Sequence, residues 1–179
     1  TKNKIYFSKH THTKYSDYLE NYFLNKNSKI ILQTRNIDDT CLSLKEHLDR
    51  GLDQPFILSA PKYWNDLNNE DKYELVARAY VPWHFDFLVS WKLFENCYRV
   101  NYTELISDTF NVIQNICEYI TLPKTNDEIN SAINVINETK NEDRNYNVGI
   151  SGRGKKKITK KAITIIEQTS EFYEKMLYK

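Results

Sequence analysis

The chain has 179 residues, with 25 lysines and arginines against 24 aspartates and glutamates, so its formal net charge is +1. Hydrophobic residues make up 40% and aromatic residues 13% of the chain, which excludes a disordered protein and is enough for the core of one domain. The near-neutral charge argues against a nucleic-acid-binding protein, and no window approaches the ~18 consecutive apolar residues of a membrane span. We therefore expect a single domain over residues 1–179, with neither nucleic acid nor membrane as a partner.

The three cysteines are far apart, and none belongs to a Cys-x-x-Cys pair. They are Cys41, Cys97 and Cys117, each in a segment of apolar periodicity. An odd number of unpaired, apolar-flanked cysteines indicates a reducing compartment. We therefore expect the protein in the cytoplasm.

The first predicted elements are two short strands at residues 4–8 and 29–34. Their β-branched and aromatic runs are typical of parallel strands that are covered on both faces. Over residues 37–48 the apolar positions recur at helical spacing, and Gly51 follows as a terminator. The second strand thus leads through a turn directly into a helix.

The rest of the chain continues this alternation of strands and helices. We expect a long, largely buried helix over residues 70–96, or two helices joined near Pro82, and a third strand over residues 97–102. Three further helices are predicted, from residue 104 to before Pro123, over 127–138 and over 158–177, with a polar, glycine-bearing stretch at 139–157. This order predicts an α/β fold with a parallel β-sheet flanked by helices.

One candidate site lies where the strand 29–34 ends. Arg35 follows this strand, and Ser43 lies eight residues further on, in the predicted helix. Ligands of open α/β sheets bind at the carboxyl ends of strands, so Arg35 is well placed to hold a phosphate. The alternative is that Arg35 pairs with Asp38 or Asp39 and that Ser43 is simply tolerated in a helix.

A second candidate is the segment 149–157, which holds three of the four glycines and four cations. Glycines allow backbone N–H groups to converge on an anion, and Arg153 adds a two-pronged donor. The spacing resembles a Walker A loop, but Lys156 stands where that motif has the magnesium-binding Ser or Thr. We therefore expect no Walker A motif here, and the alternative to an anion site is an exposed, mobile basic loop.

A third candidate follows the first predicted strand, at Lys9-His10-Thr11-His12. Two histidines at i and i+2 lack nearby cysteines or carboxylates to complete a metal site, so we expect no metal. A histidine beyond the carboxyl end of a strand suits a general base, because its ordinary pKa lies near ~6.5. The alternative is a solvent-exposed polar loop.

These segments together resemble sulfotransferases. The run from Lys29 to Ser43 is similar to the segment by which this family holds the 3′-phosphate of 3′-phosphoadenosine 5′-phosphosulfate (PAPS), which implies that Arg35 and Ser43 contact that phosphate. The segment 100–105 resembles the family's strand-to-helix signature and implies that Tyr102 approaches the adenine. The segment 150–157 is similar to the loop that closes over the 3′-phosphate, and Gly152, Arg153 and Gly154 match that loop.

The resemblance implies a P-loop-like α/β fold and transfer of a sulfuryl group from PAPS to an acceptor hydroxyl or amine, with adenosine 3′,5′-bisphosphate (PAP) as the leaving group. His12 lies 23 residues before Arg35, close to the interval that the family implies for its catalytic base, and His10 is the fallback. Lys9 is a candidate for stabilising charge on the transferring group. The acceptor is expected to be a small molecule or a carbohydrate.

The chain departs from the family in one respect. The family's phosphosulfate loop, a Lys-Ser/Thr-Gly-Thr turn between the first strand and the first helix, does not occur in the 179 residues. We therefore expect residues 1–179 to be the C-terminal two thirds of a complete domain, without its first strand, loop and helix. If the loop is truly lost, the alternative is a non-catalytic nucleotide-binding or protein-interaction module. A third interpretation makes the basic residues of 153–161 a polyanion site.

Overall fold

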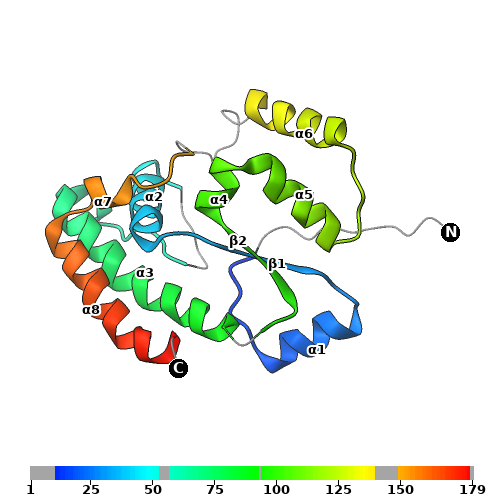
Figure 1. Ribbon diagram of the computed structural model, residues 1–179. Coiled ribbons are helices and arrows are strands. Elements are labelled where there is room, and N and C mark those ends of the chain that lie inside the picture. Colours follow the sequence, from blue (N-terminus) through cyan, green and yellow to red (C-terminus); the bar gives the residue numbers. More distant parts are fainter. Residues whose placement is uncertain (1–10, 53–56, 93, 140–148, 178–179) are drawn as a thin grey trace.

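The computed structural model describes residues 11–52, 57–92, 94–139 and 149–177 (Figure 1). Two strands are described, β1 (Ile30–Thr34) and β2 (Cys97–Asn101), and they pair in parallel, with Ile30 opposite Cys97 and Thr34 opposite Asn101. The strand predicted at residues 4–8 lies outside the described residues. The two described strands with their flanking helices confirm the predicted α/β fold with a parallel sheet.

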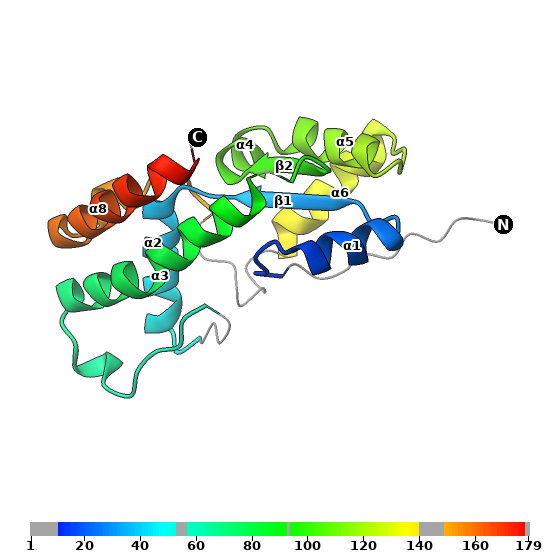
Figure 2. The same ribbon diagram turned by 90° about the horizontal axis from the view of Figure 1, so that it is seen from below.

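Helices precede, connect and follow the strands. In chain order they are α1 (Asp17–Asn25), α2 (Ile37–Asp49), the short 3-10 helix η1 (Trp64–Asp66), α3 (Asn69–Trp91), α4 (Tyr102–Ser107), α5 (Thr109–Tyr119), α6 (Asn126–Thr139), α7 (Gly154–Lys157) and α8 (Lys160–Leu177). Helices α3 and α8 lie side by side, whereas α4 and α5 lie on the opposite side of the strands (Figures 1 and 2). No described helix is long and apolar enough to cross a membrane.

Of the two alternatives for residues 70–96, the structure adopts the single helix: α3 continues through Pro82, with Val81 and Phe85 buried on either side of it. Two other details of the helices differ from the sequence predictions. The predicted helix from residue 104 is divided into α4 and α5 at Asp108, whose φ of −142° and ψ of 54° are not helical. Helices α1 and α7 were not predicted.

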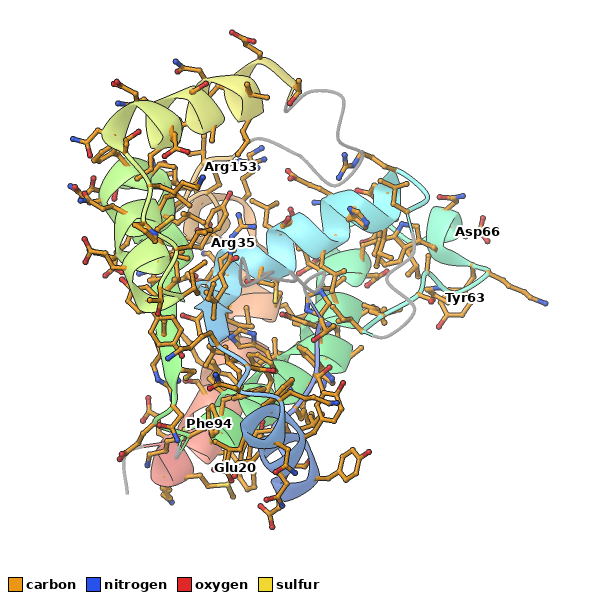
Figure 3. The ribbon with its side chains drawn as sticks, turned by 90° about the vertical axis from the view of Figure 1, so that its right-hand side faces the viewer. Glu20, Arg35, Tyr63, Asp66, Phe94 and Arg153 are labelled. Atoms are coloured by element: carbon orange, nitrogen blue, oxygen red, sulfur yellow. The ribbon has the colours of Figure 1, made fainter. Side chains whose placement is uncertain are left out.

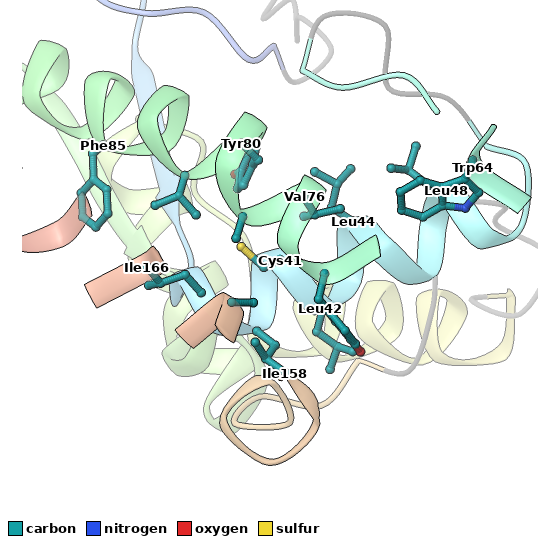
Figure 4. Close-up of a cluster of buried hydrophobic side chains, with 14 residues drawn as sticks. Cys41, Leu42, Leu44, Leu48, Trp64, Val76, Tyr80, Phe85, Ile158 and Ile166 are labelled. Atoms are coloured by element: carbon teal, nitrogen blue, oxygen red, sulfur yellow. The ribbon is translucent and has the colours of Figure 1, made fainter. Parts of the chain in front are cut away.

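The main core lies between α2, α3 and α8, and Figure 4 shows its side chains. Helix α2 presents one apolar face to α3, and α8 closes the core from the other side with Ile158, which precedes it, and Ala162 and Ile166. A smaller cluster, formed by Leu32, Trp91 and Phe94, anchors β1 against the end of α3. The strand β1 is therefore fixed relative to the C-terminal end of α3.

Both strands end in the same way, with an asparagine that caps the next helix. The Asn36 side chain accepts a hydrogen bond from the Asp38 N–H at 2.9 Å, and the Asn101 side chain accepts one from the Thr103 N–H at 2.8 Å. These caps satisfy N–H groups that have no partner inside the helix. Since Thr34 lies opposite Asn101, the next residues, Arg35 and Tyr102, leave the two strands side by side.

Candidate anion-binding site at the strand ends

Arg35 stacks on the aromatic ring of Tyr102 at the end of the two strands. Its guanidinium carbon lies 4.3 Å from the centre of that ring, a cation–π contact. The Arg35 Nε atom is buried and, among the described residues, it is the one buried side-chain nitrogen or oxygen without a hydrogen-bond partner. Figure 3 shows Arg35 where β1 passes into α2, with Arg153 on the neighbouring segment. The structure thus holds a half-buried arginine whose buried Nε–H donor is unused.

The carboxylate of Asp39 gathers the glycine-rich segment onto α2. It accepts hydrogen bonds from the Gly152 N–H at 2.6 Å, the Gly154 N–H at 2.7 Å and the Ser151 hydroxyl at 3.2 Å. Asp39 is only 2% exposed. The segment 151–154 therefore does converge on an anion, and that anion is a side chain of the protein itself. Whether Gly152 and Gly154 also contact a phosphate stays a prediction.

The pKa of Asp39 follows from these contacts. Burial raises it, but the hydrogen bonds from Gly152, Gly154 and Ser151, together with the charge of Arg35, outweigh burial and lower the pKa below its ordinary value. Asp39 is therefore ionised at neutral pH. Arg35 forms no ion pair with it in the described structure, so the alternative in which Arg35 pairs with Asp38 or Asp39 is not what this fold adopts.

Gly152 and Gly154 disfavour a side chain for different structural reasons. Gly152 has a φ of +81°, in the left-handed region that other residues rarely adopt, although a Cβ there would meet open space. A Cβ on Gly154 would lie 2.3 Å from the carbonyl carbon of Asp38 and 2.5 Å from the backbone nitrogen of Asp39. The backbone at Gly154 therefore packs directly on the first turn of α2.

Two further contacts hold this segment in place. The Arg153 guanidinium pairs with Glu46 at 2.6 Å, and their side chains are 17% and 24% exposed. On the other side, the hydroxyls of Ser151 and Thr103 lie 2.8 Å apart, which connects the segment to the start of α4. The 151–154 segment thus bridges the helices that follow both strands.

The predicted Ser43 lies on the same face of α2 as these contacts. Asp39, Ser43 and Glu46 are spaced four and three residues apart, so they fall on one side of the helix. Ser43 is half-buried between the two residues that hold the 151–154 segment. The structure therefore brings Arg35, Ser43, Tyr102, Gly152, Arg153 and Gly154 to one end of the sheet. Asp39 and Glu46 were not predicted to hold the 151–154 segment; their spacing with Ser43 shows that the three residues share one face of α2 but not which segment meets that face.

His12 lies on a segment that runs along α3. The Trp91 indole N–H donates to the Thr13 carbonyl at 2.8 Å, and the Lys14 ammonium pairs with Asp86 at 2.8 Å. The imidazole of His12 is exposed, and its centre lies 6.2 Å from that of Trp83.

Trp83 also contacts a second aromatic residue of α3. The Trp83 ring stacks on the Tyr80 ring, with 5.7 Å between the ring centres. Burial raises the pKa of Tyr80, and the charge of Arg35 partly opposes that rise. A row of rings, His12, Trp83 and Tyr80, thus lies along α3. The candidates Lys9 and His10 lie outside the described residues. Within the part of the chain that is described, no group of three or more His, Cys, Asp or Glu side chains is arranged to hold a metal.

Comparison with known proteins agrees with this geometry. A family model described as the sulfotransferase domain matches residues 2–175. The chain belongs to the sulfotransferase family. A search of curated proteins gives no match. Among solved structures, this sulfotransferase-family chain is similar to the mouse sulfotransferase SULT7A1 complexed with PAP, with a TM-score of 0.64 and 19% identity.

The alignment with the mouse protein covers 84% of this chain and 60% of the mouse chain. At this identity the likeness shows the fold alone. The comparisons thus show the family and the fold.

Proposed function

We propose that the strand-end site binds the 3′-phosphate of PAPS and PAP, and that the chain serves sulfuryl transfer from PAPS. The observation that carries this proposal is the buried Arg35 Nε without a partner. Leaving a buried donor unpaired is costly, whereas a charge-assisted bond to phosphate satisfies it. The PAP in the mouse sulfotransferase structure supports the same ligand class.

Each predicted residue has a distinct part in this proposal. Arg35 and Ser43 hold the phosphate from β1 and α2, and Arg153 reaches it from the 151–154 segment. Tyr102 stacks on the Arg35 guanidinium, and in this proposal its ring approaches the adenine. Gly152 and Gly154 let the backbone of that segment approach the site closely.

In this proposal PAPS supplies the sulfuryl group, and PAP leaves with the electron pair of the broken sulfur–oxygen bond. His12 accepts the proton from the acceptor hydroxyl or amine as the acceptor oxygen or nitrogen forms its bond to sulfur. Lys9 stabilises the charge on the transferring group. The acceptor class that we propose is a small molecule or a carbohydrate. The free thiols of Cys41, Cys97 and Cys117 support a reducing compartment such as the cytoplasm.

Calorimetric titration with PAP tests the phosphate site. We expect binding to the wild-type protein and a loss of about 2–4 kcal/mol of binding free energy in Arg35→Ala, because a charge-assisted phosphate contact disappears. Arg78→Ala is the matched control, since it removes the same charge from an exposed part of α3 where Arg78 pairs with Glu74. Failure of PAP to bind the folded protein, or equal binding by Arg35→Ala and wild type, would refute the proposal.

A further inference from the structure

We infer that Asp39 is a positioning residue that holds the 151–154 segment in the geometry that receives the 3′-phosphate before the nucleotide arrives. This inference rests on the proposed function. The Asp39 carboxylate accepts three hydrogen bonds from this segment, two from backbone N–H groups and one from the Ser151 hydroxyl. A side chain that binds only the backbone and a hydroxyl of one segment fixes the path of that segment.

The charge of Asp39 would by itself oppose this role. A carboxylate beside a phosphate site repels the ligand, and the nearby charges are of both signs. The charge of Arg35 contributes to the lowered pKa of Asp39. Asp38, one residue away on α2, is half-buried; burial raises its pKa, and the charge of Lys155 partly opposes that rise. An ionised and nearly fully buried carboxylate in this place therefore has to aid the ligand by some means other than attraction.

Asp39 aids the ligand by ordering the 151–154 segment before the ligand binds. If the segment were free, its residues would have to be ordered when the phosphate binds, and this loss of conformational freedom would weaken binding. Asp39 and Thr103 hold the segment from both sides, and Gly154 packs on the backbone of α2. The ordering is thus completed during folding, so binding is tighter than it would be to a free segment.

The test is Asp39→Asn, titrated with PAP and with adenosine 5′-phosphate, which has no 3′-phosphate. An asparagine of the same size can accept from one N–H group but turns its NH₂ toward the other, so the segment is released on one side. We expect the dissociation constant for PAP to rise roughly tenfold while that for adenosine 5′-phosphate stays within about twofold. Damage to the whole fold would weaken both ligands alike.

Asp38→Asn is the matched control, because it removes the same charge one residue away without touching the hydrogen bonds to Gly152 and Gly154. We expect it to leave PAP binding unchanged or slightly tighter. Should Asp39→Asn fail to fold, Ser151→Ala removes one of the three bonds to Asp39 together with the contact to Thr103, and it is expected to weaken PAP binding about threefold with no effect on adenosine 5′-phosphate. Thr103→Val removes only the second of these contacts and is its control.

The outcomes separate this inference from the proposed function. A wild-type protein that does not prefer PAP over adenosine 5′-phosphate overturns both. A wild-type preference for PAP that survives in Asp39→Asn, or that grows because repulsion is relieved, overturns only the role of Asp39. In the variant that folds, equal weakening of the two ligands likewise overturns it. Hydrogen exchange provides a second measure, since the N–H groups of Gly152 and Gly154 should exchange faster in Asp39→Asn without any ligand.

Discussion

The substitution Gly154→Ala provides a sharp test of how the 151–154 segment packs on α2. The added Cβ would lie 2.3 Å from the Asp38 carbonyl carbon and 2.5 Å from both the Asp38 oxygen and the Asp39 nitrogen. These atoms belong to the backbone of a helix and cannot rotate away, so the segment has to retreat by roughly 1 Å to reach ordinary contact distance. That movement breaks the bond of 2.7 Å between the Gly154 N–H and the Asp39 carboxylate.

The expected cost adds two contributions. Losing a buried hydrogen bond to a charged group costs about 1.5–3 kcal/mol, and overpacking costs about 1–3 kcal/mol. We therefore expect Gly154→Ala to lower the free energy of unfolding by about 2.5–6 kcal/mol in urea denaturation. Gly152→Ala is the control, because a Cβ there meets open space and only the φ of +81° opposes it. That strain costs about 1–2 kcal/mol. A loss in Gly154→Ala no larger than in Gly152→Ala would refute this packing.

The remaining predictions concern protonation and the cations of the site. Burial lowers the pKa of His84 to about 4, so only the unfolded chain takes up a proton as the pH falls from its ordinary value of 6.5. The wild type should therefore lose up to about 3 kcal/mol of stability between these pH values, and the slope of unfolding free energy against pH should be shallower in His84→Gln. Ser43→Ala should weaken PAP binding by about 1 kcal/mol in calorimetry, and a much larger loss would indicate structural damage. Glu46→Gln should tighten PAP binding about threefold, because it releases the Arg153 guanidinium, and unchanged or weaker binding would remove Arg153 from the site. Lys156→Ala should mainly reduce the salt dependence of PAP binding, which a series of titrations at increasing salt concentration measures.

Local patterns in the sequence were sufficient for the unit that carries the site. The apolar run of β1, the helical spacing after it and the position of Arg35 between them predicted this strand, turn and helix correctly. Helix α1 was missed because it is short and its large apolar side chains lie on more than one side: Phe23 packs against the smaller cluster, whereas Tyr18 and Tyr22 are exposed.

The contacts of Asp39 could not be predicted in the same way. Helical spacing indicates that Asp39, Ser43 and Glu46 share one face, but it does not say which distant segment meets that face. Aspartates in the first turn of a helix are ordinary, because they interact favourably with the helix dipole. The role of Asp39 depends on the 151–154 segment, and this pairing is decided by tertiary structure.

The hydrogen bonds of Asp39 also bear on the order in which the protein folds. They join residues that are 113 and 115 positions apart in the chain, whereas the strand and helix around Arg35 are local. Closing so long a loop costs chain entropy before any contact compensates for it, so such contacts tend to form late. During synthesis, Asp39 leaves the ribosome long before Gly152 and Gly154 do. Until they emerge, α2 carries a carboxylate whose hydrogen-bond partners do not yet exist, and the strand-end site is completed only when the last part of the chain folds back onto it.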